Sequence, residues 1–239
     1  MRYYKIITLL ILNVSLVGEG IKNKLSEKFI TNLAMQVSLK YHIYFPNNYH
    51  DSDTKFPLVL FLHGAGERGD DLRLVEKHGI PKMINNGINF PFITVAPQCP
   101  IFQYWSEPVN VKTLLLLVEE IIKKNKVDIE RIYATGLSMG GYGTLAIAKE
   151  RPDLFSAIIP VCGGLDTTDI ERLKDIPIWL FHGAEDKVVP VENSELIYDL
   201  LKPINPEIKI TIYKGINHNS WEMTYNNQNI YDWMLKYKK

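Results

Sequence analysis

The sequence predicts an α/β fold in which a mostly parallel central sheet is covered by helices on both faces. From residue 56 onward, short apolar runs alternate with longer segments of helical character, which is the pattern of strands joined by crossover helices. The runs contain few polar residues, as expected for strands that are buried on both faces. With 239 residues, of which 46% are hydrophobic, the chain can build one core of this kind, and we expect a single domain over residues 21–239.

Residues 1–20 have the pattern of an export signal. A basic segment, Met1–Lys5, precedes an apolar stretch over residues 6–17, and Gly18 and Gly20 supply the small residues of a cleavage site. An apolar stretch of this length is too short to span a bilayer, so we expect no stable membrane insertion. We therefore predict a signal peptide over residues 1–20 and a secreted or periplasmic location. A buried N-terminal strand or helix of a cytosolic protein is the alternative.

Charge and cysteine content argue against several classes of partner. The 27 basic and 27 acidic residues cancel, so no electrostatic attraction to nucleic acid is expected. The histidines and cysteines lack the spacing of metal ligands, so we expect no metal. Cys99 and Cys162 each follow an apolar run, which favours two buried free thiols, although export would permit a disulfide. The oligomeric state stays open.

The expected elements alternate along the chain. One or two antiparallel strands are expected within residues 28–44, before the parallel part of the sheet. Parallel strands are expected at residues 56–62, 92–96, 132–135, 155–161, 176–181 and 208–213. Helices are expected at residues 111–126, 191–201 and 230–237 and between residues 139 and 151, with a long irregular or helical segment at 72–89. In sheets of this kind, chemistry takes place at the carboxyl ends of the strands.

Ser138 occupies the apex of a predicted strand–turn–helix unit with the pattern G-x-S-x-G, residues 136–140. Such a turn is strained, and glycines on both sides of the serine let the helix and the strand approach closely. The serine hydroxyl then lies near a helix N-terminus, where developing negative charge is favourable. Because the pattern also occurs at helix starts without chemistry, assigning Ser138 as a nucleophile requires a base, an acid and an oxyanion hole elsewhere in the chain.

His218 is the predicted general base. A serine hydroxyl is a poor nucleophile at neutral pH and needs a base, normally a histidine. Of the six histidines, His218 is the one that lies in a loop directly after the last predicted strand. His63 and His182 each precede a glycine at a strand end, and we interpret them as residues that organise the backbone or support the site from behind. A surface-loop histidine is the alternative interpretation of His218.

Asp186 is the predicted acid. A carboxylate next to the base fixes its tautomer and stabilises the imidazolium. The loop after the strand at 176–181 offers Asp186 and the competing candidate Glu185, and a simple helix cap is the alternative role of Asp186. The order Ser138, Asp186, His218 is the order of the α/β-hydrolase fold.

Two backbone amides are needed to hold the oxyanion that forms when the serine attacks. Met139, which follows the nucleophile, is expected to supply one of them. The other is expected from Ala65, in the glycine-rich loop that follows the first buried strand. Gly64 and Gly66 on either side let the backbone of this loop approach a substrate carbonyl.

With these residues placed, the sequence resembles a known group of esterases. The segments HGAGERGDD at 63–71, APQC at 96–99, GLSMGG at 136–141, HGAEDKVVP at 182–190 and HNSW at 218–221 are similar to those of secreted bacterial esterases related to feruloyl and acetylxylan esterases and to polyhydroxybutyrate depolymerase. The resemblance runs from about residue 41 to the C-terminus. It implies the α/β-hydrolase fold, the triad Ser138, Asp186 and His218, and hydrolysis of carboxylic esters through an acyl-enzyme without a cofactor. It leaves the ester itself unspecified.

The sequence therefore predicts a serine carboxylesterase that acts on small esters or on feruloyl or acetyl groups of plant polysaccharides. Trp105 and Trp221 are expected either to line the acyl or sugar pocket or to pack in the core. The loop at residues 67–71 is charged where a lipase has an apolar lid, which argues against long-chain lipids. We expect these charged residues to form local salt bridges and turns.

The main alternative is a serine peptidase of the prolyl-oligopeptidase kind, which has the same triad order. The sequence offers no acidic pair for a substrate amine and no propeller-sized segment before the sheet, and both observations weaken this alternative. A hydrolase-fold binding protein without catalysis is the third interpretation. The complete set of predicted catalytic residues argues against it.

Overall fold

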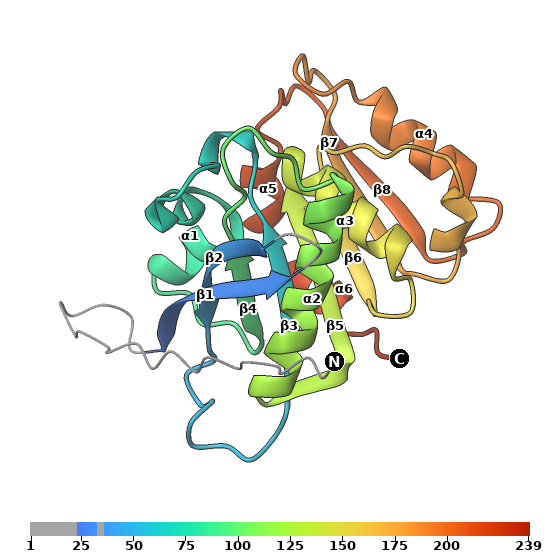
Figure 1. Ribbon diagram of the computed structural model, residues 1–239. Coiled ribbons are helices and arrows are strands. Elements are labelled where there is room, and N and C mark those ends of the chain that lie inside the picture. The colour runs from blue at the N-terminus through green and yellow to red at the C-terminus, as the bar shows by residue number, and fades with distance from the viewer. Residues whose placement is uncertain (1–22, 33–35) are drawn as a thin grey trace, which may run out of the picture.

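The computed structural model describes residues 23–32 and 36–239, and the predicted signal peptide at residues 1–20 lies outside them. In this part of the chain an eight-stranded sheet forms the centre of the molecule, in the order β1-β2-β4-β3-β5-β6-β7-β8 (Figure 1). The strands are β1 Lys24–Asn32, β2 Gln36–Tyr44, β3 Phe56–Leu62, β4 Ile93–Pro97, β5 Val127–Leu137, β6 Ala157–Val161, β7 Ile178–Gly183 and β8 Ile208–Tyr213. β2 is antiparallel to both β1 and β4, whereas all other neighbours are parallel. The predicted α/β-hydrolase fold with antiparallel N-terminal strands is confirmed.

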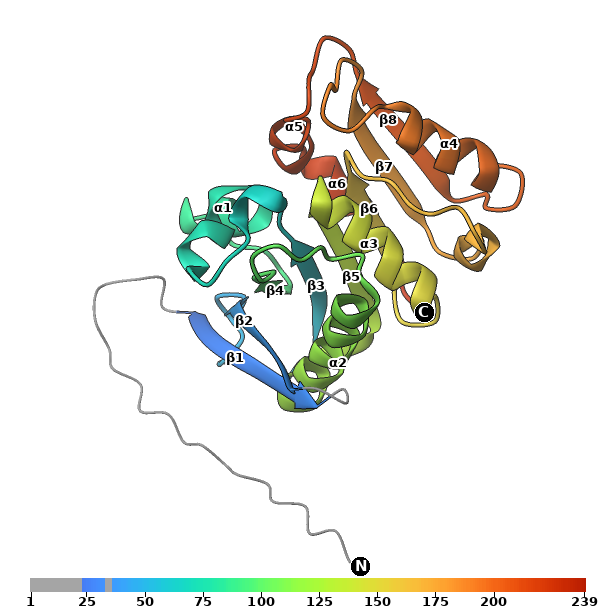
Figure 2. The same ribbon diagram turned by 45° about the horizontal axis from the view of Figure 1, so that its top comes forward.

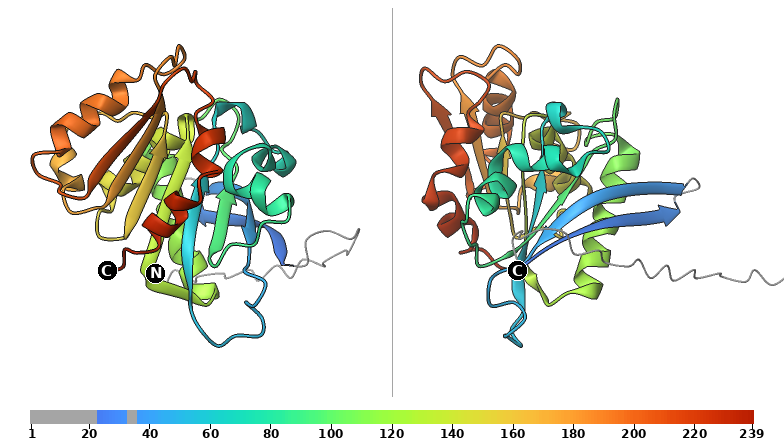
Figure 3. Two further views of the ribbon diagram at one scale, coloured as in Figure 1. Left: turned by 180° about the vertical axis from the view of Figure 1, so that it is seen from behind. Right: turned by 90° about the vertical axis from the view of Figure 1, so that its left-hand side faces the viewer.

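Helices cover both faces of the sheet (Figures 1 and 3). One face carries α2 Pro108–Lys124, α3 Met139–Glu150 and α4 Glu192–Leu201, and the other carries α1 Gly79–Asn85, α5 Trp221–Tyr225 and α6 Gln228–Met234. Among the described residues, no helix combines the length and the apolar character needed to cross a membrane.

β3 shows how the sequence produces a core on each side of the sheet. All seven of its residues are buried. Leu58, Leu60 and Leu62 belong to the core beneath α2 and α3, and Val59 and Phe61 belong to the core beneath α1, α5 and α6. Successive side chains of a strand point to opposite faces, so an uninterrupted apolar run fills both cores. Burial of each such side chain contributes about 1.5–3 kcal/mol of transfer free energy.

The expected strands and helices are present with small shifts at their ends, and three short elements were not predicted. β5 begins at Val127 rather than Ile132, because α2 already ends at Lys124. The additional elements are the five-residue helix α5 and two 3-10 helices, at Ala65–Glu67 and Ile170–Leu173. Elements of this length contain too few turns for hydrophobic periodicity to reveal them.

The carboxyl ends of the parallel strands lie along one edge of the sheet, which twists from β1 and β2 at one end to β7 and β8 at the other (Figure 2). The loops that leave this edge contain Gly64 after β3, Ser138 after β5, Asp186 after β7 and His218 after β8. The fold therefore brings together residues that are far apart in the sequence, at the edge where parallel sheets place their chemistry.

Candidate active site

Ser138 lies in the sharp turn between β5 and α3, as predicted. Its φ of +53° and ψ of −117° are strained for a residue with a side chain. The flanking glycines are required: a Cβ on Gly140 would lie 2.0 Å from the carbonyl oxygen of Leu62, and a Cβ on Gly136 would lie 2.4 Å from that of Gly140. The Ser138 amide donates a hydrogen bond to the Val161 carbonyl at 2.9 Å. The turn is thus held between β3 and β6, with its strained residue at the apex.

The structure brings Ser138, Asp186 and His218 together in one hydrogen-bonded chain. His218 Nε2 lies 2.8 Å from Ser138 Oγ, and His218 Nδ1 lies 2.7 Å from Asp186 Oδ2. An ionised carboxylate can only accept, so Nδ1 carries a proton and Nε2 is left to accept the serine hydroxyl proton. This is the tautomer that a general base needs.

Asp186, and not the exposed Glu185, is the carboxylate at the site. Its Oδ1 accepts hydrogen bonds from the amides of Val188 and Val189 at 2.8 and 2.9 Å. Burial alone would raise the pKa of Asp186, but the hydrogen bonds from His218 and from these two amides hold it below its usual value. Asp186 therefore stays ionised beside the base.

His182 supports the acid from behind and is fully buried. Its Nε2 lies 2.9 Å from the Val189 carbonyl and 3.2 Å from Asp186 Oδ2, while its Nδ1 lies 2.7 Å from Ser194 Oγ. The carbonyl can only accept, so Nε2 donates, and in the neutral ring Nδ1 accepts the Ser194 hydroxyl proton. His182 thus ties the acid loop to α4, as its expected supporting role requires.

Ala65 and Met139 are both positioned to donate to an oxyanion. Ala65 begins the 3-10 helix Ala65–Glu67 after β3, and Met139 begins α3. The first amides of a helical turn have no partner within the helix. Over residues 23–32 and 36–239, the backbone amides of Ala65 and Met139 make no backbone hydrogen bond, which leaves both available to a substrate oxygen. The two segments are in contact, since a Cβ on Gly140 would lie 2.8 Å from the His63 carbonyl oxygen.

His63 organises the loop that carries Ala65. Its Nδ1 donates to the Gly64 carbonyl at 2.6 Å, and its Nε2 accepts from the Cys99 amide at 2.9 Å. Burial lowers the pKa of His63 to about 4, so the ring is neutral at physiological pH, in agreement with this hydrogen-bond pattern. The expectation that His63 organises backbone rather than performing chemistry fits these contacts.

The two tryptophans have different environments. Trp105 has no exposed surface, and its Nε1 donates to the His63 carbonyl at 3.1 Å. The structure contradicts the pocket-lining interpretation of Trp105, because a fully buried ring cannot touch a substrate; it packs in the core. Trp221 is half-buried and stands edge-on to His218, with ring centroids 5.3 Å apart, and edge-on to His78 at 5.5 Å. Trp221 therefore forms a wall beside the base.

Sequence reasoning missed His78 and the environment of Glu67. Glu67 is buried, and its Oε1 lies 3.8 Å from His78 Nε2. His78 Nδ1 in turn lies 3.3 Å from Glu222 Oε1, on α5. No pattern marked His78, because it lies in an irregular segment and its partners come from distant parts of the chain. Asp71 forms the expected local salt bridge, with Arg73: Asp71 Oδ2 lies 2.8 Å from Arg73 Nη2.

Cys99 and Cys162 are free and buried, as the sequence favours. Cys162 is close to the chemistry: its Sγ and the ligand atoms of Asp186 and His218 all lie within 4.8 Å of one another. Thiolate, carboxylate and imidazole are all metal ligands. However, burial raises the pKa of the Cys162 thiol to about 12, and Asp186 and His218 are hydrogen-bonded to each other. The cluster is therefore better suited to proton transfer than to metal coordination.

Comparison with known proteins supports this site. Residues 107–232, which is more than half of the chain, match the phospholipase/carboxylesterase family. The chain is 36% identical over 92 residues to acyl-protein thioesterase 1 homolog 2 of Dictyostelium discoideum, covering 36% of this chain and 41% of that protein. It is 25% identical over 198 residues to acyl-protein thioesterase 1 of Gibberella zeae, covering 68% and 83%. The crystal structure of a thermostable esterase matches with a TM-score of 0.80 and 35% identity, over 92% of this chain and 64% of that chain.

The coverage of these relatives differs, and the chain spans less than half of the Dictyostelium protein. A ferulic acid esterase of 15% identity, with a TM-score of 0.66, shares the fold. The family match extends over Ser138, Asp186 and His218, which the fold assembles into one hydrogen-bonded chain. On the strength of this match, the chain belongs to the phospholipase/carboxylesterase family.

Proposed function

We propose that the protein is a serine carboxylesterase that cleaves carboxylic esters through an acyl-enzyme. The observation that carries this proposal is the hydrogen-bonded chain from Asp186 through His218 to Ser138, with distances of 2.7 and 2.8 Å. Nucleophilic catalysis by serine requires a base within hydrogen-bond reach and a third group that orients the base. Family membership and the likeness to a thermostable esterase support the same reaction.

The mechanism follows from the positions of these groups. His218 Nε2 takes the Ser138 proton as Oγ attacks the ester carbonyl carbon, and the amides of Ala65 and Met139 hold the resulting oxyanion. His218 then gives the proton to the leaving alcohol, while Asp186 orients and stabilises the imidazolium. Water, deprotonated by the same histidine, attacks the acyl-enzyme, releases the carboxylic acid and restores Ser138.

The proposed substrates are small esters and feruloyl or acetyl groups on plant polysaccharides. The resemblance of the motifs to those of feruloyl and acetylxylan esterases supports this choice, and Trp221 offers an aromatic surface beside His218. We also propose that the protein is exported through residues 1–20. Cell fractionation tests export, and N-terminal sequencing of the recovered protein tests cleavage of the signal. Recovery from the cytoplasm alone would contradict export, and an intact Met1 on exported protein would contradict cleavage.

Substitution of the nucleophile tests the reaction. We expect the wild type to hydrolyse p-nitrophenyl acetate or methyl ferulate, and Ser138→Ala to lower kcat by about 10⁴-fold or more, because no other group can form the acyl-enzyme. Ser38→Ala, at an exposed serine of β2, is the matched control and should retain full activity. Ester hydrolysis that survives Ser138→Ala would refute the proposal. Faster cleavage of proline-containing amides than of esters would favour the peptidase alternative instead.

A further inference from the structure

A groove between α2 and α3 has no role in the reaction described above. It encloses about 650 Å³. Pockets that bind small organic molecules have volumes of about 300–1,000 Å³, so the groove is large enough for a ligand. Its walls come from α2, from α3 and from the loop after β6.

One end of the groove lies one helical turn from the catalytic serine. Tyr142 lines it and lies one helical turn after Ser138, whose carbonyl accepts a hydrogen bond from the Tyr142 amide at 3.1 Å. The Tyr142 ring rests against Gly164, where a Cβ would lie 2.7 Å from the ring. Gly164 follows Cys162 by two residues, and the Cys162 Sγ belongs to the cluster within 4.8 Å of Asp186 and His218. The lining residues Tyr142 and Gly164 therefore mark the end of the groove that is nearest to the triad, while the triad residues themselves do not line it.

The floor of the groove is apolar. It includes Val111 and Leu115 of α2, which are buried, and the half-buried Ala146 of α3 and Leu165 of the loop after β6. Charged residues stand at the rim, where Lys149 Nζ donates to the carbonyls of Asp166 and Thr168, both at 2.9 Å. These two hydrogen bonds fasten the loop that forms one wall. An apolar floor favours hydrocarbon over a hydroxyl-rich sugar, because hydroxyl groups buried without partners lose hydrogen bonds to water.

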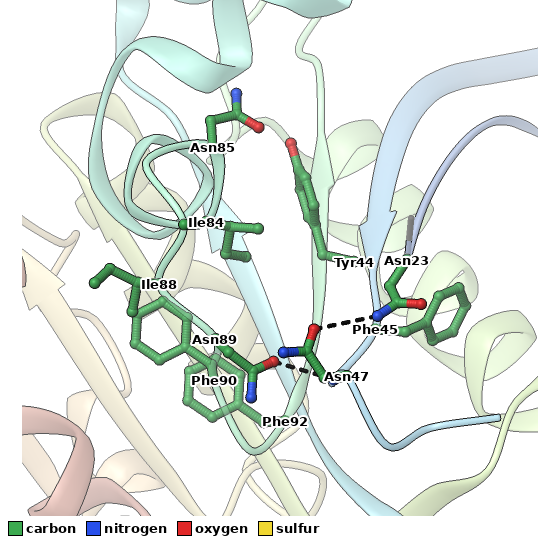
Figure 4. A pocket seen from close by; sticks show the side chains of 11 residues that line it. Asn23, Tyr44, Phe45, Asn47, Ile84, Asn85, Ile88, Asn89, Phe90 and Phe92 are labelled. Carbon is green, nitrogen blue, oxygen red and sulfur yellow. Dashed lines mark hydrogen bonds between the residues drawn. The ribbon is translucent and has the colours of Figure 1, made fainter. Parts of the chain in front are cut away.

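A second cavity provides a useful contrast (Figure 4). It measures about 150 Å³ and is lined by Tyr44, Phe92 and several asparagines. Two hydrogen bonds, from Asn23 to Asn47 and from the Asn47 amide to Asn89, link its polar residues. Phe92 directly precedes β4, so this cavity lies at the amino ends of the parallel strands, at the opposite edge of the sheet from Ser138. It is too remote to hold any part of a substrate whose ester bond is at the serine.

We propose that the groove between α2 and α3 binds the acyl group of the substrate and selects apolar acyl groups larger than acetyl, either medium-length alkyl or aromatic. This inference rests on the proposed esterase function and specifies its substrate. Each methylene buried in the groove contributes about 0.8 kcal/mol, which corresponds to about fourfold in kcat/KM. The preference is therefore built up along the length of the acyl group.

The test uses p-nitrophenyl esters from acetate to hexanoate, in which only the acyl group changes. We expect kcat/KM of the wild type to rise by about fourfold per methylene until the groove is filled. Ala146→Trp places a large ring on the apolar floor, and we expect it to lower the hexanoate-to-acetate ratio of kcat/KM by about tenfold or more. Leu165→Trp narrows the groove from the opposite wall and should act in the same direction. Ile88→Trp, at an exposed position lining the second cavity, is the matched control and should leave the ratio unchanged.

The outcomes separate the groove from the reaction. An unchanged ratio in both groove variants, with native thermal unfolding, would overturn the inference. A change confined to a series of alkyl acetates, in which only the alcohol varies, would also overturn it by assigning the groove to the leaving group. If the wild type hydrolyses no ester, the proposed function fails, and calorimetric titration with hexanoate still tests the groove. Binding to the wild type that Ala146→Trp abolishes would support it, and equal or absent binding in both would refute it.

Discussion

The oxyanion loop after β3 and the acid loop at the end of β7 begin with the same tripeptide, His-Gly-Ala, at residues 63–65 and 182–184. Both histidines are buried, with 1% and 0% of their surface exposed. In both loops the glycine lets a neighbouring segment of the chain pack directly against the loop backbone. A Cβ on Gly64 would lie 2.8 Å from the Leu137 side chain, and a Cβ on Gly183 would lie 2.2 Å from the Asn217 carbonyl oxygen, next to His218.

The two histidines differ in what they hold. The His63 ring forms hydrogen bonds with two backbone groups, the Gly64 carbonyl and the Cys99 amide, and so determines where the loop carrying the Ala65 amide runs. The Glu67 carboxylate lies farther away, 4.0 Å from His63 Nδ1. His182 directs its Nε2 proton toward the Val189 carbonyl and toward Asp186, an ionised group of the triad. The same tripeptide, His-Gly-Ala, thus supports an uncharged amide donor in the oxyanion loop and the charged carboxylate of Asp186 in the acid loop. We expect loss of His63 to appear mainly in stability and its pH dependence, and loss of His182 mainly in catalysis.

The largest effect is expected at the acid itself. Asp186→Asn removes the charge that stabilises the imidazolium and permits the wrong tautomer of His218. We expect kcat to fall by about 10⁴-fold, or about 5.5 kcal/mol in activation free energy. Steady-state kinetics with p-nitrophenyl acetate measure the change. Glu185→Gln, at the exposed neighbouring carboxylate, should remain near wild-type activity. A tenfold or smaller loss in Asp186→Asn would exclude Asp186 as the acid of the triad.

The next effect concerns the stability provided by His63. Its pKa is lowered by burial from 6.5 to about 4, so between these values the unfolded chain binds a proton that the folded protein does not. The free energy of unfolding must therefore decrease as pH falls from 6.5 to 4, by about 3 kcal/mol from this residue alone. In His63→Gln this contribution is absent, and urea unfolding at several pH values between 7 and 4 should show a correspondingly smaller decrease.

Other groups titrate between pH 4 and 6.5, but their contributions cancel when the wild type is compared with His63→Gln. Burial also lowers the pKa of His42 to about 4, but His42 is present in both proteins and cancels in the difference. His63→Gln is also expected to lower stability at pH 7, because the buried hydrogen bonds to Gly64 and Cys99 are disturbed. Identical pH slopes for the wild type and His63→Gln would show that His63 titrates as an exposed histidine does.

The sequence was sufficient for those features that depend on local pattern or on strand order. The continuous apolar run of β3, the glycines around Ser138 and the order of Ser138, Asp186 and His218 each follow from rules that a single segment or the topology satisfies. Trp105 shows the limit of this reasoning. An aromatic ring in a loop suits both a pocket and a core, and Trp105 is buried in the core, where its Nε1 donates a hydrogen bond to the His63 carbonyl, 42 residues away.

Neither the groove between α2 and α3 nor the position of Trp221 beside His218 could be predicted from the sequence, for a similar physical reason. The groove exists because α2 and α3 pack side by side with the loop after β6 across one end, and no single segment contains that arrangement. Trp221 meets His78 only because α5, which is too short for periodicity to mark, lies against α1. Both features depend on tertiary contacts between segments whose own sequence patterns are weak.

The smallest of the three effects is expected at His182. His182→Asn shortens the side chain and keeps an amide only near the position of Nδ1, so it cannot reach Val189 and Asp186; the carboxylate loses a supporting donor while its bond to His218 remains. We expect kcat to fall by about 10- to 100-fold, as is typical for positioning groups behind a reacting residue, with KM nearly unchanged. Ser194→Ala is the matched control, because it removes the hydroxyl on Nδ1 and leaves the contact between Nε2 and Asp186 intact. If Ser194→Ala and His182→Asn reduce kcat equally, His182 acts through the packing of α4 and not through the acid, and the contrast with His63 disappears.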